Sequence, residues 1–203
     1  MAFSQELELN GVRIIQGALD AEAQAVLLED IRGILRAAPL FQPVTPTERP
    51  LSVRMSAAGE YGWVSDRKGY RYEARHPSGK PWPPIPPSLF LLWEKYSHSD
   101  RMPECCLVNW YAPEAKMGLH QDKDEADLTQ PVLSISLGDE ARFRVGGQNR
   151  RDPTRSVWLK SGDIAVLQGA SRLAFHGVDK SRPKSSRLMP NGGRVNLTLR
   201  VVT

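Results

Sequence analysis

Residues 194–200 read RVNLTLR, and polar and apolar side chains alternate along them without exception. Because successive side chains of a β-strand point to opposite faces, this stretch predicts a strand with one polar and one apolar face. A polar face of this kind either meets solvent, as is common in antiparallel sheets, or lines a polar site inside the fold. The residues of the polar face are Arg194, Asn196, Thr198 and Arg200.

Short runs rich in β-branched residues fill the chain from residue 104 onward, and Gly, Pro, Asp or Asn separates them. Strands of this kind with turn residues between them are typical of all-β barrels and jelly rolls. The basic stretch Asp179–Gly193 is expected to be irregular. The expected strands are Cys105–Tyr111, Val132–Leu137, Ala141–Val145, Ser156–Leu159, Ile164–Leu167 and Arg194–Val202.

The first 103 residues have a different pattern. Asn10-Gly11 between two apolar runs predicts a β-hairpin, and Asp20 is a candidate N-cap for a helix that ends at Pro39. Residues 40–87 hold nine of the 16 prolines, so regular structure should be short there. We expect a strand near Leu51–Met55, a hairpin over Gly62–Tyr72 and a helix over Ser88–Ser97. The chain thus divides into an N-terminal extension with one helix (1–45), a second segment (46–103) and a β-rich core (104–203).

Composition excludes several classes of protein. The chain has 203 residues, of which 40% are hydrophobic and 25% charged, as expected of one globular domain. The longest uncharged apolar run, Leu89–Trp93, is too short to cross a membrane, and the acidic N-terminus lacks the apolar segment of a secretory signal. The adjacent Cys105 and Cys106 exclude a disulfide scaffold and favour the reducing cytoplasm.

The charge is unevenly distributed along the chain. The net charge is +4, but residues 1–30 carry −5 and the remaining residues carry +9. The basic part is either an ordinary solvated surface or a face that binds a polyanion such as nucleic acid. Charge alone favours neither.

His120-Gln121-Asp122 is a candidate metal-binding motif. In an extended chain its histidine and carboxylate point to the same side, and His176 is a candidate third ligand. Two histidines and one carboxylate on one face of a metal are typical of non-haem Fe(II) oxygenases, which leave positions open for a co-substrate and dioxygen. Because His-x-Asp is common by chance, a solvated histidine beside a turn aspartate is the alternative for the motif alone.

The two arginines of residues 194–200 suit a short dicarboxylate. Six strand residues span roughly 20 Å. If each side chain leans inward by about 6–7 Å, the guanidinium groups lie about 6–8 Å apart, one for each carboxylate. Asn109 and Tyr111 share a face of the expected strand Cys105–Tyr111. They either contribute to the same polar site or are ordinary hydrogen-bonded core residues.

Four segments, in this order, resemble the bacterial members of the AlkB family of DNA repair dioxygenases. The resemblance covers roughly residues 50–203. It implies a mainly β (α+β) fold, with a double-stranded β-helix (jelly-roll) core, an N-terminal helical extension and a nucleotide-recognition lid. The segments are Asn109–Tyr111, His120–Glu125, Ser171–His176 and Arg194–Arg200.

The same resemblance implies the roles of individual residues. Fe(II) would be held by His120, Asp122 and His176, which are catalytic through the metal. The residues for 2-oxoglutarate would be Asn109, Trp110, Tyr111, Arg194, Asn196 and Arg200. The residues for substrate would be Met55, Trp63, Tyr70, Arg71, Tyr72, Asp124 and Arg150. Trp63 would stack on one side of a flipped base, and His120 would close the other side. Asp124 would accept a hydrogen bond from the exocyclic amine of the base or attract its positive charge.

The implied activity is oxidative demethylation of N-alkylated bases, such as 1-methyladenine and 3-methylcytosine, by a cytoplasmic monomer that uses Fe(II), 2-oxoglutarate and dioxygen. The substrate would be single- or double-stranded DNA, with RNA as a further possibility, and the products would be formaldehyde, succinate and CO2. One alternative is a related oxygenase that acts on a protein or a small metabolite, against which the lid aromatics and the basic charge argue. Another is a non-catalytic nucleic-acid-binding barrel, against which the intact triad argues. Leu167 and Gln168 depart from the pattern of the bacterial relatives at the pocket wall.

Overall fold

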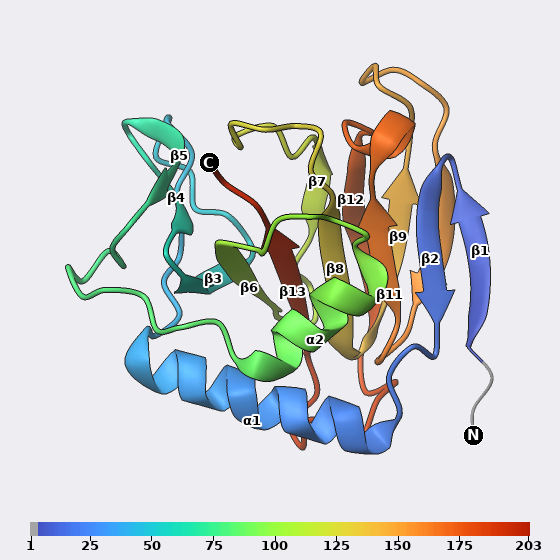
Figure 1. Cartoon of the computed structure of the whole chain (residues 1–203), viewed down its shortest axis with the longest axis horizontal. Coiled ribbons are helices and arrows are strands. Elements are labelled where there is room, and N and C mark those ends of the chain that lie inside the picture. Colours follow the sequence, from blue (N-terminus) through green and yellow to red (C-terminus); the bar gives the residue numbers. More distant parts are fainter. Residues whose placement is uncertain (1–3) are drawn as a thin grey trace.

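The computed structural model describes residues 4–203, which form sheets of seven, four and two strands, two α-helices and one short 3-10 helix. The two larger sheets enclose one apolar core, and the helices pack on the outer face of the seven-stranded sheet (Figure 1). This arrangement is that of a jelly roll, so the predicted fold class is confirmed.

All strands of the larger sheet are antiparallel, in the order β1-β2-β11-β8-β13-β6-β3. Both of its faces are covered. In β8, Leu133 and Ile135 pack toward the helices, whereas Ser134 lines the interior of the barrel. The strands are β1 (Gln5–Leu9), β2 (Val12–Gln16), β3 (Arg54–Gly59), β6 (Cys105–Tyr111), β8 (Val132–Gly138), β11 (Ile164–Leu167) and β13 (Arg194–Arg200).

The smaller sheet has the order β10-β9-β12-β7, and two of its strands were not predicted. The strands are β7 (Met117–His120), β9 (Glu140–Val145), β10 (Arg155–Leu159) and β12 (His176–Arg182). The expectation that Asp179–Gly193 is irregular is wrong for its first four residues, which continue β12. Their polar sequence gives no strand signal, and it is the ladder with β9, interrupted by a bulge after Val178, that holds them extended.

The N-terminal elements join the same architecture. The predicted hairpin turns at Asn10 and Gly11, whose φ angles are 49° and 81°, and β2 pairs with β11 of the larger sheet. Asp20 caps α1 (Ala21–Ala37) by accepting the N–H of Ala23 over 2.9 Å. Helix α2 (Pro87–Tyr96) follows the proline-rich segment, and the 3-10 helix η1 covers Gly169–Ser171.

A separate hairpin of β4 (Gly62–Asp66) and β5 (Gly69–Glu73) forms the two-stranded sheet, as predicted. The strand expected near Leu51–Met55 begins later, as β3. The indole of Trp82 donates to the carbonyl of Glu73 over 2.8 Å, and its ring lies so close to Gly62 that an added Cβ would meet it at 2.3 Å. The proline-rich segment thus packs against the β4–β5 hairpin through Trp82.

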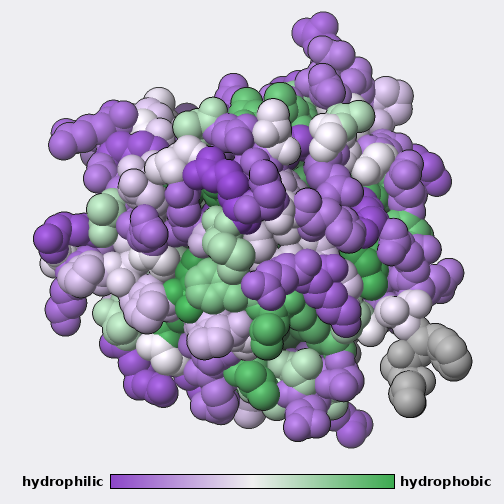
Figure 2. Space-filling model, viewed as in Figure 1, coloured by the Kyte–Doolittle hydropathy of each residue, from purple (hydrophilic) through white to green (hydrophobic). Residues whose placement is uncertain are grey.

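The face seen in Figure 2 is mostly hydrophilic, and its apolar residues gather over the two helices. Val26 of α1 and Leu91 of α2 are among the large apolar side chains that remain exposed. Within residues 4–203, neither helix combines the length and the apolar character that crossing a bilayer requires. Cys105 and Cys106 are buried free thiols.

Candidate metal and co-substrate site

A cavity of about 510 Å³ lies between the two large sheets, with the β4–β5 hairpin at its side. Polar residues from β6, β7, β12 and β13 share its wall with apolar ones such as Leu107 and Phe143. The structure thereby brings together most residues predicted to act. Those that line the cavity are Met55, Trp63, Tyr70, Asn109, Tyr111, His120, Asp122, Asp124, Arg150, His176, Arg194, Asn196 and Arg200.

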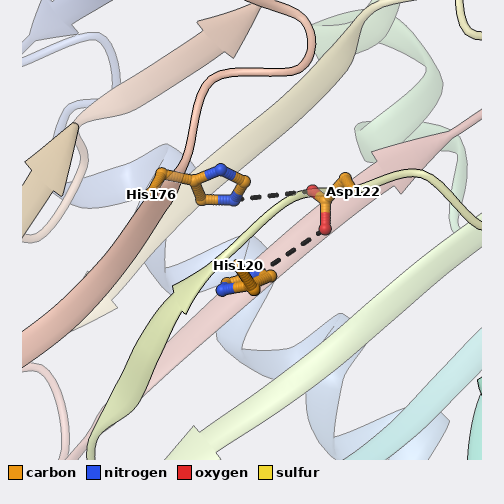
Figure 3. A group of neighbouring side chains, drawn as sticks. All are labelled: His120, Asp122 and His176. Atoms are coloured by element: carbon orange, nitrogen blue, oxygen red, sulfur yellow. Dashed lines mark ion pairs between the residues drawn. The ribbon is translucent and has the colours of Figure 1, made fainter. Parts of the chain in front are cut away.

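His120, Asp122 and His176 form the predicted triad. Their ligand atoms all lie within 4.8 Å of one another, with 3.7 Å from His120 Nε2 and 3.6 Å from His176 Nε2 to the Asp122 carboxylate (Figure 3). Strand pairing creates the group, because His120 and His176 are direct partners in the β7–β12 ladder. Each Nδ1–H donates to a carbonyl two residues earlier, of Gly118 and Ala174, so each Nε2 lone pair remains free for a metal.

The protonation state of the triad suits a metal ion. Burial lowers the pKa of His176 to about 4, so its imidazole is neutral at pH 7. Burial tends to raise the pKa of Asp122, but the positive charge of Arg200, with smaller contributions from the neighbouring His176, His120 and Arg172, outweighs it and holds the pKa well below its usual range. Neutral imidazole and ionised carboxylate are the forms that bind divalent metals. The donor set therefore fits Fe(II).

Unpaired buried donors mark the place of a bound anion. Arg194 is 2% exposed and donates through Nη2 to Ser136 Oγ over 2.9 Å. Within residues 4–203, its Nε and Nη1 have no hydrogen-bond partner, and neither does Nε of Arg200. Burying such groups unpaired is costly, so their presence in one cavity fits an acidic ligand with two ends. The residues present therefore fit 2-oxoglutarate.

The amide of Asn196 is held in place by its neighbours. It donates to Ser134 Oγ over 2.8 Å and to the carbonyl of Ile135 over 3.0 Å, and its oxygen accepts from Thr198 over 3.1 Å. Tyr111 lies under the guanidinium of Arg194, whose carbon is 5.9 Å from the ring centroid. Burial raises the pKa of Tyr111 to about 12, so its hydroxyl stays a donor at neutral pH.

Arg200 joins the metal group to a second buried carboxylate. Its Nη2 lies 2.9 Å from Asp122 Oδ2, and its Nη1 lies 3.0 Å from Glu125 Oε1. On the other side, Arg172 Nη2 lies 3.0 Å from Glu125 Oε2, and Arg172 also donates to the backbone carbonyl of Asp122. The hydroxyl of Tyr72 donates to Glu125 over 2.5 Å. Two arginines and two carboxylates thus balance each other in the interior.

The hairpin brings an aromatic platform to the cavity. The indole N–H of Trp63 donates to Asp124 Oδ2 over 2.8 Å. Tyr70 stacks on the same ring, with centroids 5.5 Å apart and planes 13° from parallel. Arg150 is held from the opposite side, since it donates to the carbonyl of Leu119 over 3.0 Å and lies over Phe175. Trp63, Asp124 and Arg150 are thus fixed at the cavity before any substrate arrives.

Three residues predicted for the site do not line the cavity. Trp110 lies on the opposite face of β6, packed in the cluster beneath the helices, because alternation along the strand separates it from Asn109 and Tyr111. Arg71 is engaged within the hairpin by ion pairs to Asp66 and Glu73. Tyr72 points into the buried charge network instead.

The sequence reasoning missed the residues behind the wall. No role was predicted for Glu125 or Arg172, although they lie in the segments His120–Glu125 and Ser171–His176. A charged residue in a sequence gives no sign that it is buried. Ser134 and Ser136 had a usable signal, since they interrupt the apolar run of β8 with the same two-residue spacing as the polar residues of β13.

The chain is similar to known proteins over most of its length. A family model described as the 2OG-Fe(II) oxygenase superfamily matches residues 11–200. The chain is 53% identical over 191 residues to the "Alpha-ketoglutarate-dependent dioxygenase AlkB homolog" of Caulobacter vibrioides, covering 94% of this chain and 87% of that protein. It is 31% identical to the Arabidopsis thaliana "DNA N(6)-methyladenine demethylase ALKBH1C", covering 94% of this chain and 48% of that one. A solved structure described as "The structure of OsALKBH1" matches with a TM-score of 0.77 and 30% identity, over 97% of this chain and 99% of that one.

Proposed function

Given that this chain belongs to the AlkB family of the 2OG-Fe(II) oxygenase superfamily, we propose that it demethylates N-methylated nucleobases, such as 1-methyladenine and 3-methylcytosine, in DNA, with RNA as a further substrate class. The chain is an Fe(II)- and 2-oxoglutarate-dependent dioxygenase. The choice of a nucleobase rests on one observation. The hydrogen-bonded pair of Trp63 and Asp124 lines the same cavity as the metal-binding triad.

His120, Asp122 and His176 would hold the iron, and Arg194, Asn109, Tyr111, Asn196 and Arg200 the 2-oxoglutarate. When bound, iron and 2-oxoglutarate supply, with dioxygen, the oxidation of a methyl C–H bond, while the co-substrate leaves as succinate and CO2. A hydroxymethyl group on a ring nitrogen then breaks down to formaldehyde and the repaired base. The protein's part is to hold the methyl group toward the triad and to exclude competing water.

Substrate recognition would come from the hairpin side. Trp63 offers a flat face for a flipped base, and Tyr70 stiffens that face by stacking on it. Asp124 keeps one carboxylate oxygen for an exocyclic amine, because the indole N–H occupies the other. Its negative charge also suits a base that carries a positive charge after N-methylation. Such a base pairs and stacks less well, so flipping it costs less.

The surroundings suit a nucleic acid rather than a protein or metabolite. Tyr70 is 50% exposed beside the cavity, and residues 31–203 carry a charge of +9. Basic residues of this density attract phosphate groups. The Arabidopsis relative is named as a DNA N(6)-methyladenine demethylase, so its named substrate is also a methylated base in DNA. We expect a monomer to bind one flipped base from either single- or double-stranded substrate.

A panel of methylated oligonucleotides tests the proposal. Purified protein with Fe(II), 2-oxoglutarate and ascorbate is incubated with single- and double-stranded DNA and RNA that contain 1-methyladenine or 3-methylcytosine. Formaldehyde should be released in proportion to the lesion, and unmethylated oligonucleotides are the control. Succinate formation without formaldehyde from any member of the panel would contradict demethylation of these bases and leave only the oxygenase activity.

A further inference from the structure

Glu125 connects the β4–β5 hairpin to the interior of the barrel. Its side chain has no exposed surface, although it carries a charge. Both oxygens are used, since Oε1 accepts from Tyr72 and Arg200 and Oε2 accepts from Arg172. Charged groups are buried only when they are paired, so this carboxylate is built into a specific arrangement.

Tyr72 makes this arrangement more than a neutralising pair. It belongs to β5, and its hydroxyl donates to Glu125 and also accepts from Arg200 Nη1 over 3.0 Å. The hairpin makes few other contacts with β13, which carries Arg200. A movement of β5 would therefore act on the guanidinium of Arg200 through one hydroxyl and one carboxylate.

The orientation of Arg200 depends on these contacts. Nη1 is held by Glu125 and Tyr72, and Nη2 is held by Asp122. The remaining donor, Nε, is buried and has no partner within residues 4–203. Because both terminal nitrogens are held, the guanidinium has a fixed orientation, and its unpaired Nε–H is available to an anion in the cavity. Glu125, together with Tyr72 and Asp122, thus fixes the orientation in which Arg200 meets the co-substrate.

We propose that Glu125 is a positioning residue that couples the hairpin to the co-substrate site, so that order in β4–β5 and binding of 2-oxoglutarate favour each other. The proposal rests on the proposed function only for the place of 2-oxoglutarate beside Arg200. Coupling between two sites is reciprocal, so a change in the hairpin that breaks its contact with Glu125 must alter the affinity for 2-oxoglutarate. Binding of a nucleic acid at Trp63 would in turn strengthen the binding of 2-oxoglutarate.

Three variants test this link. Tyr72→Phe removes only the hydroxyl, and Glu125→Gln removes the charge while keeping the shape. Glu73→Gln is the matched control, because Glu73 follows Tyr72 on β5 but its carboxylate pairs with Arg71 outside the network. Mn(II) replaces iron to prevent turnover. The dissociation constant of 2-oxoglutarate is measured by calorimetry, and hydrogen exchange of residues 62–73 is followed with and without 2-oxoglutarate.

In the native protein, 2-oxoglutarate should slow exchange in residues 62–73. In Tyr72→Phe and Glu125→Gln this slowing should be lost and the dissociation constant should rise by about fivefold or more, whereas Glu73→Gln should behave as the native protein. A variant that combines Tyr72→Phe and Glu125→Gln should bind 2-oxoglutarate no more weakly than Glu125→Gln alone, because both changes break the same link. If Glu125→Gln does not fold, Tyr72→Phe still tests the link.

Unchanged 2-oxoglutarate binding in Tyr72→Phe would overturn the coupling, as would an equal change in Glu73→Gln. Neither measurement uses a nucleic acid or turnover. Failure of the demethylation assay would therefore leave this result interpretable on its own.

Discussion

His176 lies directly opposite His120 in the antiparallel ladder of β7 and β12, and their ring centroids are 4.5 Å apart. This register explains how residues separated by more than fifty positions share one metal site. The strands also fix the hydrogen bond that each Nδ1 makes to a backbone carbonyl. The geometry of the two imidazoles is thus a property of the sheet and precedes any metal.

Asp122→Ala should weaken metal binding and abolish turnover while the fold is retained. The variant loses the only carboxylate of the triad and leaves Arg200 with Glu125 as its remaining charged partner. Affinity for Mn(II), measured by calorimetry, should fall by roughly a hundredfold or more. Asp127→Ala is the control, since Asp127 lies on the same loop and its carboxylate bonds to Thr129 and Gln130. Native affinity in Asp122→Ala would disprove the ligand assignment.

Arg194→Lys should weaken 2-oxoglutarate binding. A lysine keeps the charge but loses the planar fork, and the unpaired Nε and Nη1 of Arg194 are the donors that a carboxylate would take. Losing a charge-assisted pair costs about 1.5–3 kcal/mol, which corresponds to roughly a tenfold to hundredfold rise in the apparent constant. Arg182→Lys, on the outside of β12 where Arg182 covers Trp158, should leave the constant unchanged.

The sequence predicted most of this arrangement because its signals are local. Alternation along RVNLTLR and CCLVNWY predicted which residues share a face with Arg194 and with Asn109, and the structure shows that both faces line the cavity. Local signals failed where long-range contacts decide the structure. β12 has no apolar alternation after Val178 and is extended because it pairs with β9. The burial of Glu125 follows from packing against β5 and β13, which no pattern near residue 125 reveals.

Binding of methylated DNA should weaken as salt concentration rises. Lysines and arginines that neutralise phosphates release counterions, and the logarithm of affinity then falls linearly with the logarithm of salt concentration, by about 0.7–0.9 per phosphate contact. Fluorescence anisotropy with a labelled 3-methylcytosine oligonucleotide, in the presence of Mn(II) and 2-oxoglutarate, measures this slope. A slope near zero would argue against the basic surface as the nucleic-acid face.

Trp63→Ala should raise the KM for methylated oligonucleotide by roughly tenfold to a hundredfold, because base–aromatic stacking contributes about 1–3 kcal/mol. Trp63→Phe keeps a ring but loses the N–H that bonds to Asp124, so its effect should be smaller. The constant for 2-oxoglutarate, measured in the absence of nucleic acid, serves as the control. Equal effects of both variants would show that the hydrogen bond to Asp124, rather than stacking, carries recognition.

The metal-free protein should lose stability as the pH falls from 7 to 5, partly through His176. Burial lowers the pKa of His176 from 6.5 to about 4. Between these two values the unfolded chain binds a proton at His176 and the folded chain does not. The stability is therefore complete above pH 6.5 and is lost as the pH falls toward 4. The expected loss between pH 7 and pH 5 is about 2 kcal/mol. Urea unfolding of native protein and His176→Gln in EDTA, followed by tryptophan fluorescence, measures it. The variant lacks the ionisable group, so its free energy of unfolding should depend less on pH by this amount, and an identical dependence in the two proteins would show that His176 is not buried in its neutral form.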